Sequence, residues 1–315
     1  MIIKNRKIPL SILYNQALIR RISPDSIHLP QIQADLLKLW AGYHGECKVD
    51  RHLSTIDNPD LFILNDLCLP IGSTFFQIDS LILSKSFSVI IEVKNIAGVL
   101  EIGGEFEQLS RTINGETTGF TNPLSQAKRY KIHLLHWMKM KKIPMLPVEY
   151  LVVFTNSSSI LNSMKNSQNN LKRIIRVENL VPTFMSLQQK YSIVHLINKQ
   201  LKRLTNLLNK SHIQYPNNMT EEKIIKGVQC TSCLEFSMIR NQSSWFCPNC
   251  EIYDKKAHEQ AIYDYLLLKH PTINNKKARE FLRVDSPKVI HRLLNNMNLA
   301  SRGEKKARVY FLPDY

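Results

Sequence analysis

The sequence lacks any apolar run close to the roughly 18 residues that a membrane-spanning helix requires. Its first twenty residues mix charged and short apolar pieces and contain no apolar central region of a secretory signal peptide. Glycine and proline number only 10 and 14 among 315 residues, which argues against a long disordered chain. These absences predict a folded cytoplasmic protein with no membrane partner, long enough for two or three domains.

Acidic residues are scarce relative to basic ones. The chain has 42 Lys and Arg against 26 Asp and Glu, a formal charge of +16. The excess is concentrated, with eleven basic against three acidic residues in 161–227 and thirteen against seven in 254–315. Such a surface attracts polyanions, of which nucleic acid is the common one, although an ordinary solvated basic surface is the alternative.

Disulfides are not expected without a secretory signal, so the six cysteines need another explanation. Two of them, Cys47 and Cys68, lie in segments with a helix-like and a strand-like pattern and are interpreted as small core residues. The other four follow the spacing C-x₂-C, thirteen residues, C-x₂-C. This spacing closes a tetrahedral site, so it predicts a structural zinc ribbon whose Zn²⁺ ligands are Cys230, Cys233, Cys247 and Cys250.

The first half of the chain reads as an α/β domain. Apolar periodicity, turn residues and an Asn122 cap before Pro123 predict a helix, three strands, a hairpin around Gly103-Gly104, a second helix and a buried strand. The expected ranges are 31–56 for the first helix, 61–69, 74–83 and 88–94 for the strands, 98–113 for the hairpin and 148–156 for the last strand.

Two of these strands carry charges that strand interiors rarely hold unpaired, namely Asp79, Glu92 and Lys94. Glu92 and Lys94 are two residues apart and share a face, and Asp79 can face Glu92 if strands 74–83 and 88–94 pair. Carboxylates held together repel one another, which a divalent cation such as Mg²⁺ or Mn²⁺ relieves. Lys94 could then position or deprotonate a water, or stabilise phosphorane charge. A simple ion pair on an edge strand is the alternative.

The sequence around these charges is similar to the sequences of a known family. The segments "AGYHGECKVDRHL", "FQIDSLIL", "IIEVKNIAG" and "NPLSQAKRY" together resemble the nuclease-related domain (NERD) family of the PD-(D/E)XK nuclease superfamily, over about residues 30–160. The resemblance implies a restriction-endonuclease-like core, with a mixed central sheet flanked by helices. One departure is that Ile78, and not proline, precedes Asp79.

The resemblance also implies roles for individual residues. Glu46, Asp79 and Glu92 would ligate Mg²⁺ or Mn²⁺, and Lys94 would complete the Glu-x-Lys pair. Gln126 and Tyr130 would match the Gln-x₃-Tyr helix motif, and their i, i+4 spacing places them on one helix face. The implied catalytic residues are therefore Glu46, Asp79, Glu92, Lys94, Gln126 and Tyr130.

Two neighbours of these residues have simpler interpretations. His133 continues the stripe of Gln126 and Tyr130, and we interpret it as part of an ordinary amphipathic helix. Gly45, before Glu46, would let another element approach closely, the alternative being a tolerated helical glycine.

The C-terminal segment predicts three helices, over 254–270, 273–284 and 285–299, and a basic hairpin around Arg302-Gly303. This order resembles a winged helix-turn-helix, whose third helix enters the major groove and whose wing contacts the backbone. A helical protein-interaction module is the alternative. The candidate DNA-contacting residues are Lys288, His291, Arg292, Asn295, Arg302, Lys305, Lys306 and Arg308.

Together these patterns predict four regions: a nuclease-like domain in 1–160 with its core in 36–156, a basic helical region and linker in 161–227, the zinc ribbon in 228–253 and the winged helix in 254–315. The second region is expected to contain a loop at 157–170, a helix at 184–210 and a linker at 210–223. The predicted function is metal-dependent hydrolysis of DNA phosphodiester bonds. The alternatives are a catalytically inactive DNA-binding or regulatory protein and an RNA-directed enzyme.

Overall fold

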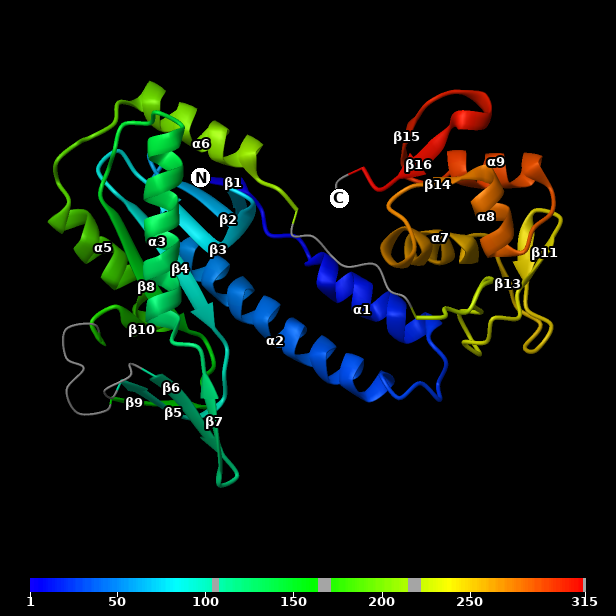
Figure 1. Cartoon of the computed structure of the whole chain (residues 1–315), viewed down its shortest axis with the longest axis horizontal. Helices are drawn as coiled ribbons and strands as arrows, with labels where there is room; N and C mark the ends of the chain where they lie inside the picture. The colour runs from blue at the N-terminus through cyan, green and yellow to red at the C-terminus, as the bar shows by residue number, and fades with distance from the viewer. Residues whose placement is uncertain (104–107, 164–170, 215–221, 314–315) are drawn as a thin grey trace. The chain divides into compact units, whose positions relative to one another are not determined.

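The computed structural model of the protein describes residues 1–103, 108–163, 171–214 and 222–313. The chain divides into two compact units, one formed by residues 1–7 and 40–215 and the other by residues 8–39 and 216–315. Figure 1 shows both units with most of their helices and strands labelled. Among the described residues, no helix combines the length and apolar character needed to cross a membrane.

The first unit is built on a mixed six-stranded sheet with the order β1-β2-β3-β4-β8-β10. The middle strands β2, β3 and β4 pair antiparallel, whereas β1 pairs parallel with β2, β8 parallel with β4 and β10 parallel with β8. The prediction of an α/β fold with a mixed central sheet is therefore confirmed. The bounds of the strands are β1 Ile2–Lys4, β2 Phe62–Ile71, β3 Thr74–Leu83, β4 Ser88–Lys94, β8 Val148–Phe154 and β10 Ile174–Arg176.

Helices cover both faces of this sheet (Figure 1). Helices α3 (Pro123–Met140) and α6 (Asn198–Ser211) pack on one face, in a core that includes Ile90 of β4. Helices α2 (Leu29–Leu53) and α5 (Leu180–Lys190) pack on the other, against Val89, Ile91 and Val93. The odd-numbered apolar residues of β4 thus share one face, as the period of two predicts.

A second sheet of four strands has the order β7-β6-β5-β9. Its strands are β5 (Gly98–Gly103), β6 (Gln108–Ile113), β7 (Glu116–Phe120) and β9 (Ser159–Ser163). The antiparallel pairing of β5 with β6 confirms the predicted hairpin, although Gly104 at its turn lies outside the described residues. The prediction of a loop over 157–170 is wrong at its start, because residues 159–163 form strand β9, which pairs parallel with β5. The rest of that loop, from 164, lies outside the described residues.

The single helix expected over 184–210 is also wrong, since α5 ends at Lys190 and α6 begins at Asn198. The break coincides with contacts to distant parts of the chain. The ring of Tyr191 stacks on Phe87 at 5.3 Å, and the backbone N–H groups of His195 and Leu196 both donate to the Lys85 carbonyl at 2.9 Å. Tertiary packing therefore overrides the helical propensity of this segment.

The second unit contains α1 (Leu10–Arg21), which the sequence did not indicate, the first part of α2 and a group of C-terminal helices. These helices are α7 (Ala257–Leu268), α8 (Asn275–Leu282) and α9 (Pro287–Asn295), which confirms the three predicted C-terminal helices. Ser286 caps α9 by accepting from the Val289 N–H. The predicted hairpin is also confirmed: β15 (Ala300–Arg302) pairs antiparallel with β16 (Val309–Phe311), and β14 (Ile273–Asn274) joins the same sheet.

A buried ion pair fixes α1 within this unit. The Arg21 guanidinium donates to the Asp264 carboxylate of α7 at 2.8 Å, and the side chains of both residues are 1% exposed. Arg21 also donates to the carbonyls of Ile225 and Gly227. Because a buried charge requires a partner, these bonds tie α1, α7 and the segment before the cysteines together.

A second charge cluster fixes the edge of the large sheet. Glu149 of β8 is 4% exposed and accepts from the Arg173 guanidinium and the Tyr191 hydroxyl, while Lys190 lies 3.3 Å away. Burial alone would raise the pKa of Glu149, but these hydrogen bonds and the charge of Arg173 outweigh it and lower the pKa to about 2. The ionised carboxylate thus stabilises the contact between β8, the start of β10 and the end of α5.

We expect Glu149→Gln to lower the free energy of unfolding of the first unit by on the order of 3 kcal/mol at pH 7. The folded-state pKa lies below that of the unfolded chain, so this contribution is present above about pH 4.5 and is lost as the pH falls towards 2. Urea unfolding should show a difference in the free energy of unfolding between wild type and variant that becomes smaller over that pH range. The exposed Glu178→Gln is the control, and an equal loss in both variants would contradict the prediction.

Candidate functional site

Three of the predicted site residues come from two paired strands at the centre of the large sheet. Asp79 lies in β3, and Glu92 and Lys94 lie at the end of β4. The ladder pairs Ser80 with Ile91, so the next position places Asp79 opposite Glu92. The Val93 N–H donates to Asp79 Oδ2 at 2.7 Å, which holds this carboxylate at the end of β4. The predicted hairpin therefore brings the two acids together.

Glu46 reaches the same region from α2, and the three carboxylates interact electrostatically. Glu92 is 2% exposed. Burial, followed by the charge of Asp79, raises the pKa of both Glu92 and Glu46 to about 8. Burial also raises the pKa of Asp79. Such shifts mark a site where negative charge is only partly compensated, a common property of functional centres.

Lys94 is held between the acids and α3. Its Nζ donates to Glu92 Oε1 at 2.7 Å and to Gln126 Oε1 at 3.2 Å. Gln126 Nε2 in turn donates to the Tyr130 hydroxyl at 3.1 Å. Burial lowers the pKa of Lys94, but the charge of Glu92 outweighs it and the net shift is upward. Glu92, Lys94, Gln126 and Tyr130 thus form one hydrogen-bonded chain that joins β4 to α3.

His133 lies outside this chain. Its ring packs edge-on against Phe76 with 5.3 Å between ring centroids, and burial lowers its pKa. Within the described part of the chain its buried Nδ1 has no hydrogen-bond partner. These contacts agree with the interpretation of His133 as part of an amphipathic helix.

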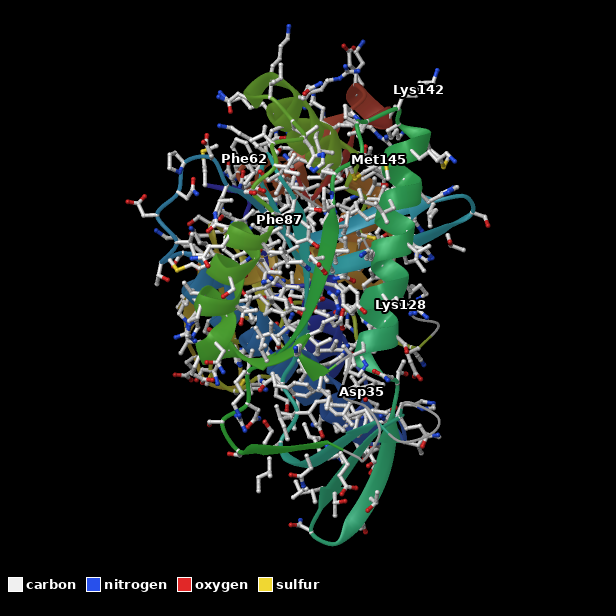
Figure 2. All side chains as sticks on the ribbon, turned by 90° about the vertical axis from the view of Figure 1, so that its left-hand side faces the viewer. Asp35, Phe62, Phe87, Lys128, Lys142 and Met145 are labelled. Carbon is white, nitrogen blue, oxygen red and sulfur yellow. The ribbon has the colours of Figure 1, made fainter. Side chains whose placement is uncertain are left out.

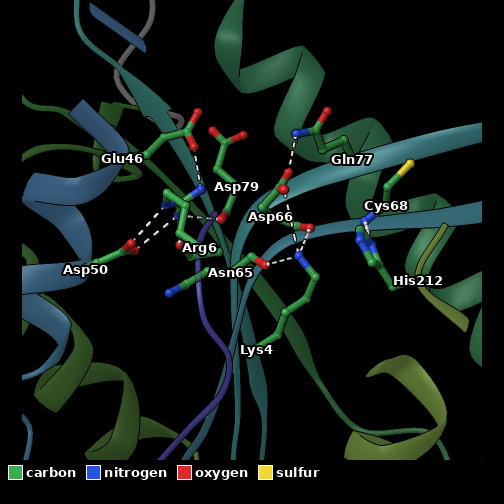
Figure 3. Close-up of polar contacts among 11 residues, drawn as sticks. Lys4, Arg6, Glu46, Asp50, Asn65, Asp66, Cys68, Gln77, Asp79 and His212 are labelled. Carbon is green, nitrogen blue, oxygen red and sulfur yellow. Dashed lines mark hydrogen bonds and ion pairs between the residues drawn. The ribbon is translucent and has the colours of Figure 1, made fainter. Parts of the chain in front are cut away.

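Arg6, which no sequence pattern indicated, follows β1 and lies among the acids (Figure 3). Its guanidinium pairs with Glu46 and, through Nε at 2.9 Å, with Asp50. It also donates to the Asp79 carbonyl at 2.8 Å and to Ser80 Oγ at 3.0 Å. A lone arginine near the start of the chain gives no local signal, although several acids converging on one site do require a cation.

The close approach predicted at Gly45 is confirmed. A Cβ atom there would lie 2.6 Å from Asn95 Cβ and 2.8 Å from Thr155 Oγ1, both shorter than ordinary contacts. Asn95 donates to the Ala41 carbonyl at 2.7 Å, so α2 and the residue after β4 are joined at this point. The glycine allows α2 to carry Glu46 against the sheet.

We expect Gly45→Ala to destabilise the first unit by about 1–3 kcal/mol, because the added methyl group overpacks this contact. Gly42→Ala is the matched control, since nothing lies within 4 Å of a Cβ atom there. That control should stabilise the same helix by about 0.5–1 kcal/mol. Urea unfolding measures both changes, and equal effects of the two substitutions would refute the steric explanation.

The carboxylates offer ligand atoms for a divalent cation but do not converge on a single point. Among the described residues, the metal-binding atoms of the four cysteines all lie within 4.8 Å of one another, and Glu46, Asp79 and Glu92 form no comparable group. However, Glu92 Oε2 is buried and has no hydrogen-bond partner in the described structure. A buried oxygen without a donor fits a cation, since it would otherwise bear an uncompensated desolvation cost.

The four cysteines gather as the spacing predicts. Cys230 Sγ lies 3.5 Å from Cys250 Sγ, and Cys233 Sγ lies 3.6 Å from Cys247 Sγ. Between the two C-x₂-C motifs, β11 (Ile239–Asn241) and β12 (Ser244–Phe246) form the expected hairpin. β13 (Tyr253–Asp254) pairs with β12. Four sulfurs in this arrangement fit a closed tetrahedral Zn²⁺ site.

The candidate DNA-contacting residues divide by exposure. Lys288, His291 and Arg292 are exposed on α9, while the buried face of the helix is apolar. Asn295 is also exposed, but its side-chain oxygen accepts from the Tyr310 hydroxyl at 2.8 Å. In the hairpin region Arg302 and Lys305 are exposed and Arg308 is half-buried, whereas the side chain of Lys306 lies outside the described structure.

Comparison with known proteins bears on residues 41–155, which match the family model of the nuclease-related domain. Among curated proteins no match is found. One solved structure with some similarity is the small subunit of the heterodimeric restriction endonuclease R.BspD6I, at 14% identity over 63% of this chain and 87% of that chain. Its TM-score of 0.18 is too low to bear on fold or function. From the family match, residues 41–155 of the chain are a nuclease-related domain.

Proposed function

We propose that the protein is a metal-dependent nuclease that hydrolyses phosphodiester bonds of DNA. The observation that carries this proposal is the half-buried Asp79 opposite the buried Glu92 on adjacent strands, with Lys94 hydrogen-bonded to Glu92, inside a nuclease-related domain. A bound Mg²⁺ or Mn²⁺ would polarise a water and the scissile phosphate. Asp79 and Glu92 would hold this cation, and Glu46 is the third proposed acid.

The hydrogen-bonded chain supports a role for Lys94 in charge stabilisation. Its raised pKa keeps it protonated at neutral pH, so it suits the negative charge that develops on the phosphorane better than it suits proton abstraction. Gln126 fixes Lys94 Nζ from the α3 side, and Tyr130 fixes Gln126. These residues would orient the substrate phosphate relative to the acids.

The charge of α3 supports a polyanionic substrate. The helix carries Gln126 and Tyr130 and has no acidic residue. Its lysines and arginine are Lys128, Arg129, Lys131 and Lys139. Figure 2 shows Lys128 on this helix and Lys142 just beyond its end. Cationic side chains beside a phosphodiester-cleaving centre favour the nucleic-acid backbone by counterion release.

We also propose roles for the C-terminal region, with the boundaries given above. Residues 228–253 would bind a structural Zn²⁺, and residues 254–315 would act as a winged helix that holds DNA. In support, α9 exposes Lys288, His291 and Arg292, and Arg302 and Lys305 extend the basic surface in the hairpin. Lys306 and Arg308 would add phosphate contacts, and Asn295 would position Tyr310 rather than read a base.

Cleavage of labelled DNA by the purified full chain tests the proposal. Linear, nicked and circular substrates are incubated with Mg²⁺, Mn²⁺ or EDTA, together with RNA of the same sequence. We expect metal-dependent cleavage of DNA that EDTA abolishes. Cleavage of RNA alone would overturn the assignment of DNA as substrate, and the absence of cleavage of any substrate would overturn the nuclease assignment.

A second candidate is a DNA-binding or regulatory protein that does not cut. It is favoured by the pairing of Glu46 with Arg6 and by the failure of the carboxylates to converge on one point, in contrast to the cysteines. This candidate predicts tight, salt-sensitive binding of DNA in a gel-shift assay with no cleavage under any metal.

A further inference from the structure

Arg6 is fixed inside the acidic site by bonds from each of its three guanidinium nitrogens. Nε and Nη2 donate to the two carboxylate oxygens of Asp50, and Nη1 donates to the Glu46 carboxylate. Nη2 also donates to the Asp79 carbonyl and to Ser80 Oγ. The side chain is only 3% exposed. A bidentate guanidinium–carboxylate pair is directional, so Asp50 sets the position of Arg6 and Arg6 sets the position of Glu46.

The charges around this site leave room for one divalent cation. When all of these acids are ionised, as a metal-bound site requires, the partly or fully buried acids outnumber the cations by two unit charges. A single Mg²⁺ or Mn²⁺ would neutralise this difference, whereas a second ion would create an excess of positive charge next to the guanidinium. The acids are Glu46, Asp50, Asp66, Asp79 and Glu92, and the cations are Lys4, Arg6 and Lys94.

Some carboxylate oxygens of the site are already paired with Arg6, and at least one lacks a positive partner in the described structure. Glu46 and Asp50 are already engaged by Arg6, so their oxygens face a permanent cation. Glu92 Oε2, which is buried and lacks a partner among the described residues, is the oxygen that still requires one. The guanidinium bonds the backbone carbonyl of Asp79 (Figure 3). The unsatisfied oxygen belongs to Glu92, the other acid of the strand pair.

We infer that Arg6 is a built-in cation that takes the place of a second metal ion, so that the centre binds one divalent cation through Asp79 and Glu92. Arg6 is then a positioning residue that holds Glu46 and supplies a fixed positive charge. This inference rests on the proposed function, since it assumes that the carboxylates bind a metal ion. It makes a specific claim about stoichiometry that the proposed function does not.

Counting bound Mn²⁺ tests the inference without an activity measurement. Free Mn²⁺ is measured by electron paramagnetic resonance as the ion is titrated into the full chain loaded with zinc. Asp79→Asn gives the number of ions bound elsewhere, which is subtracted. We expect one ion for the wild type, one for Arg6→Lys, which keeps the charge, and two for Arg6→Gln, which removes it.

The possible outcomes separate the inference from the proposed function. Two ions in the wild type would overturn the role of Arg6 and leave the nuclease proposal standing, and this result needs no variant that might fail to fold. One ion in a folded Arg6→Gln protein with unchanged affinity would overturn it equally. No ion beyond the Asp79→Asn count in the wild type would overturn the proposed metal centre itself.

Discussion

Replacing Lys94 with methionine is expected to lower the single-turnover rate of DNA cleavage by a factor on the order of 10³, because the variant loses a cation aimed at the developing phosphorane charge. Lys94 Nζ is held 2.7 Å from Glu92 and 3.2 Å from Gln126, so its position is set before substrate arrives. Methionine has a similar length without the charge. Quenched-flow measurement at saturating Mg²⁺ gives the rate.

Lys85→Met is the matched control for this experiment. Lys85 precedes β4 and pairs with Asp60 at 2.7 Å, an ion pair whose acid is 57% exposed. Removing such a surface pair costs at most about 1 kcal/mol and should leave the cleavage rate unchanged. A Lys94→Met protein that is folded and cleaves at the wild-type rate would contradict the proposed role of Lys94.

Loss of the proposed zinc site is expected to have the largest effect on stability. Cys230 and Cys247 are fully buried and belong to the same core as Trp245 and the helices of the second unit. Structural Zn²⁺ contributes on the order of 10 kcal/mol to small domains of this kind. We expect Cys247→Ser to lose the metal and to unfold the ribbon, which measurement of zinc per chain and calorimetry of the full chain would show.

Cys47→Ser serves as the control for the zinc experiment, because Cys47 is a half-buried residue of α2 outside the cysteine cluster. It should retain one zinc per chain and nearly the wild-type melting temperature. Wild-type protein that contains no zinc after expression in zinc-supplemented medium, or a Cys247→Ser variant that melts like the wild type, would refute a structural zinc site.

The centre of the candidate site could be predicted because its residues obey local periodicities. The period of two places Glu92 and Lys94 on one face of β4, and the hairpin register brings Asp79 to them. The spacing of Gln126 and Tyr130 places both on one face of α3, where they bond to each other and to Lys94. The paired C-x₂-C knuckles likewise require only short-range geometry.

The features that could not be predicted depend on contacts between distant segments. Arg6 lies 40 residues before Glu46, and no local pattern indicates that the two meet. The break between α5 and α6 depends on Phe87 and Lys85, about one hundred residues upstream. β9 is short, and its strand character arises from its pairing with β5 and not from its own Ser- and Asn-containing sequence.

Cleavage of labelled duplex DNA by wild-type and Asp79→Asn protein, purified side by side and titrated with Mg²⁺, tests the central claim most directly. Asp79→Asn keeps the size and the hydrogen-bond acceptor for the Val93 N–H but removes the charge. The account predicts cleavage by the wild type that rises with Mg²⁺ and falls by at least about a hundredfold in the variant. Equal cleavage by both proteins, or none by the wild type with Mg²⁺ or Mn²⁺, would contradict it.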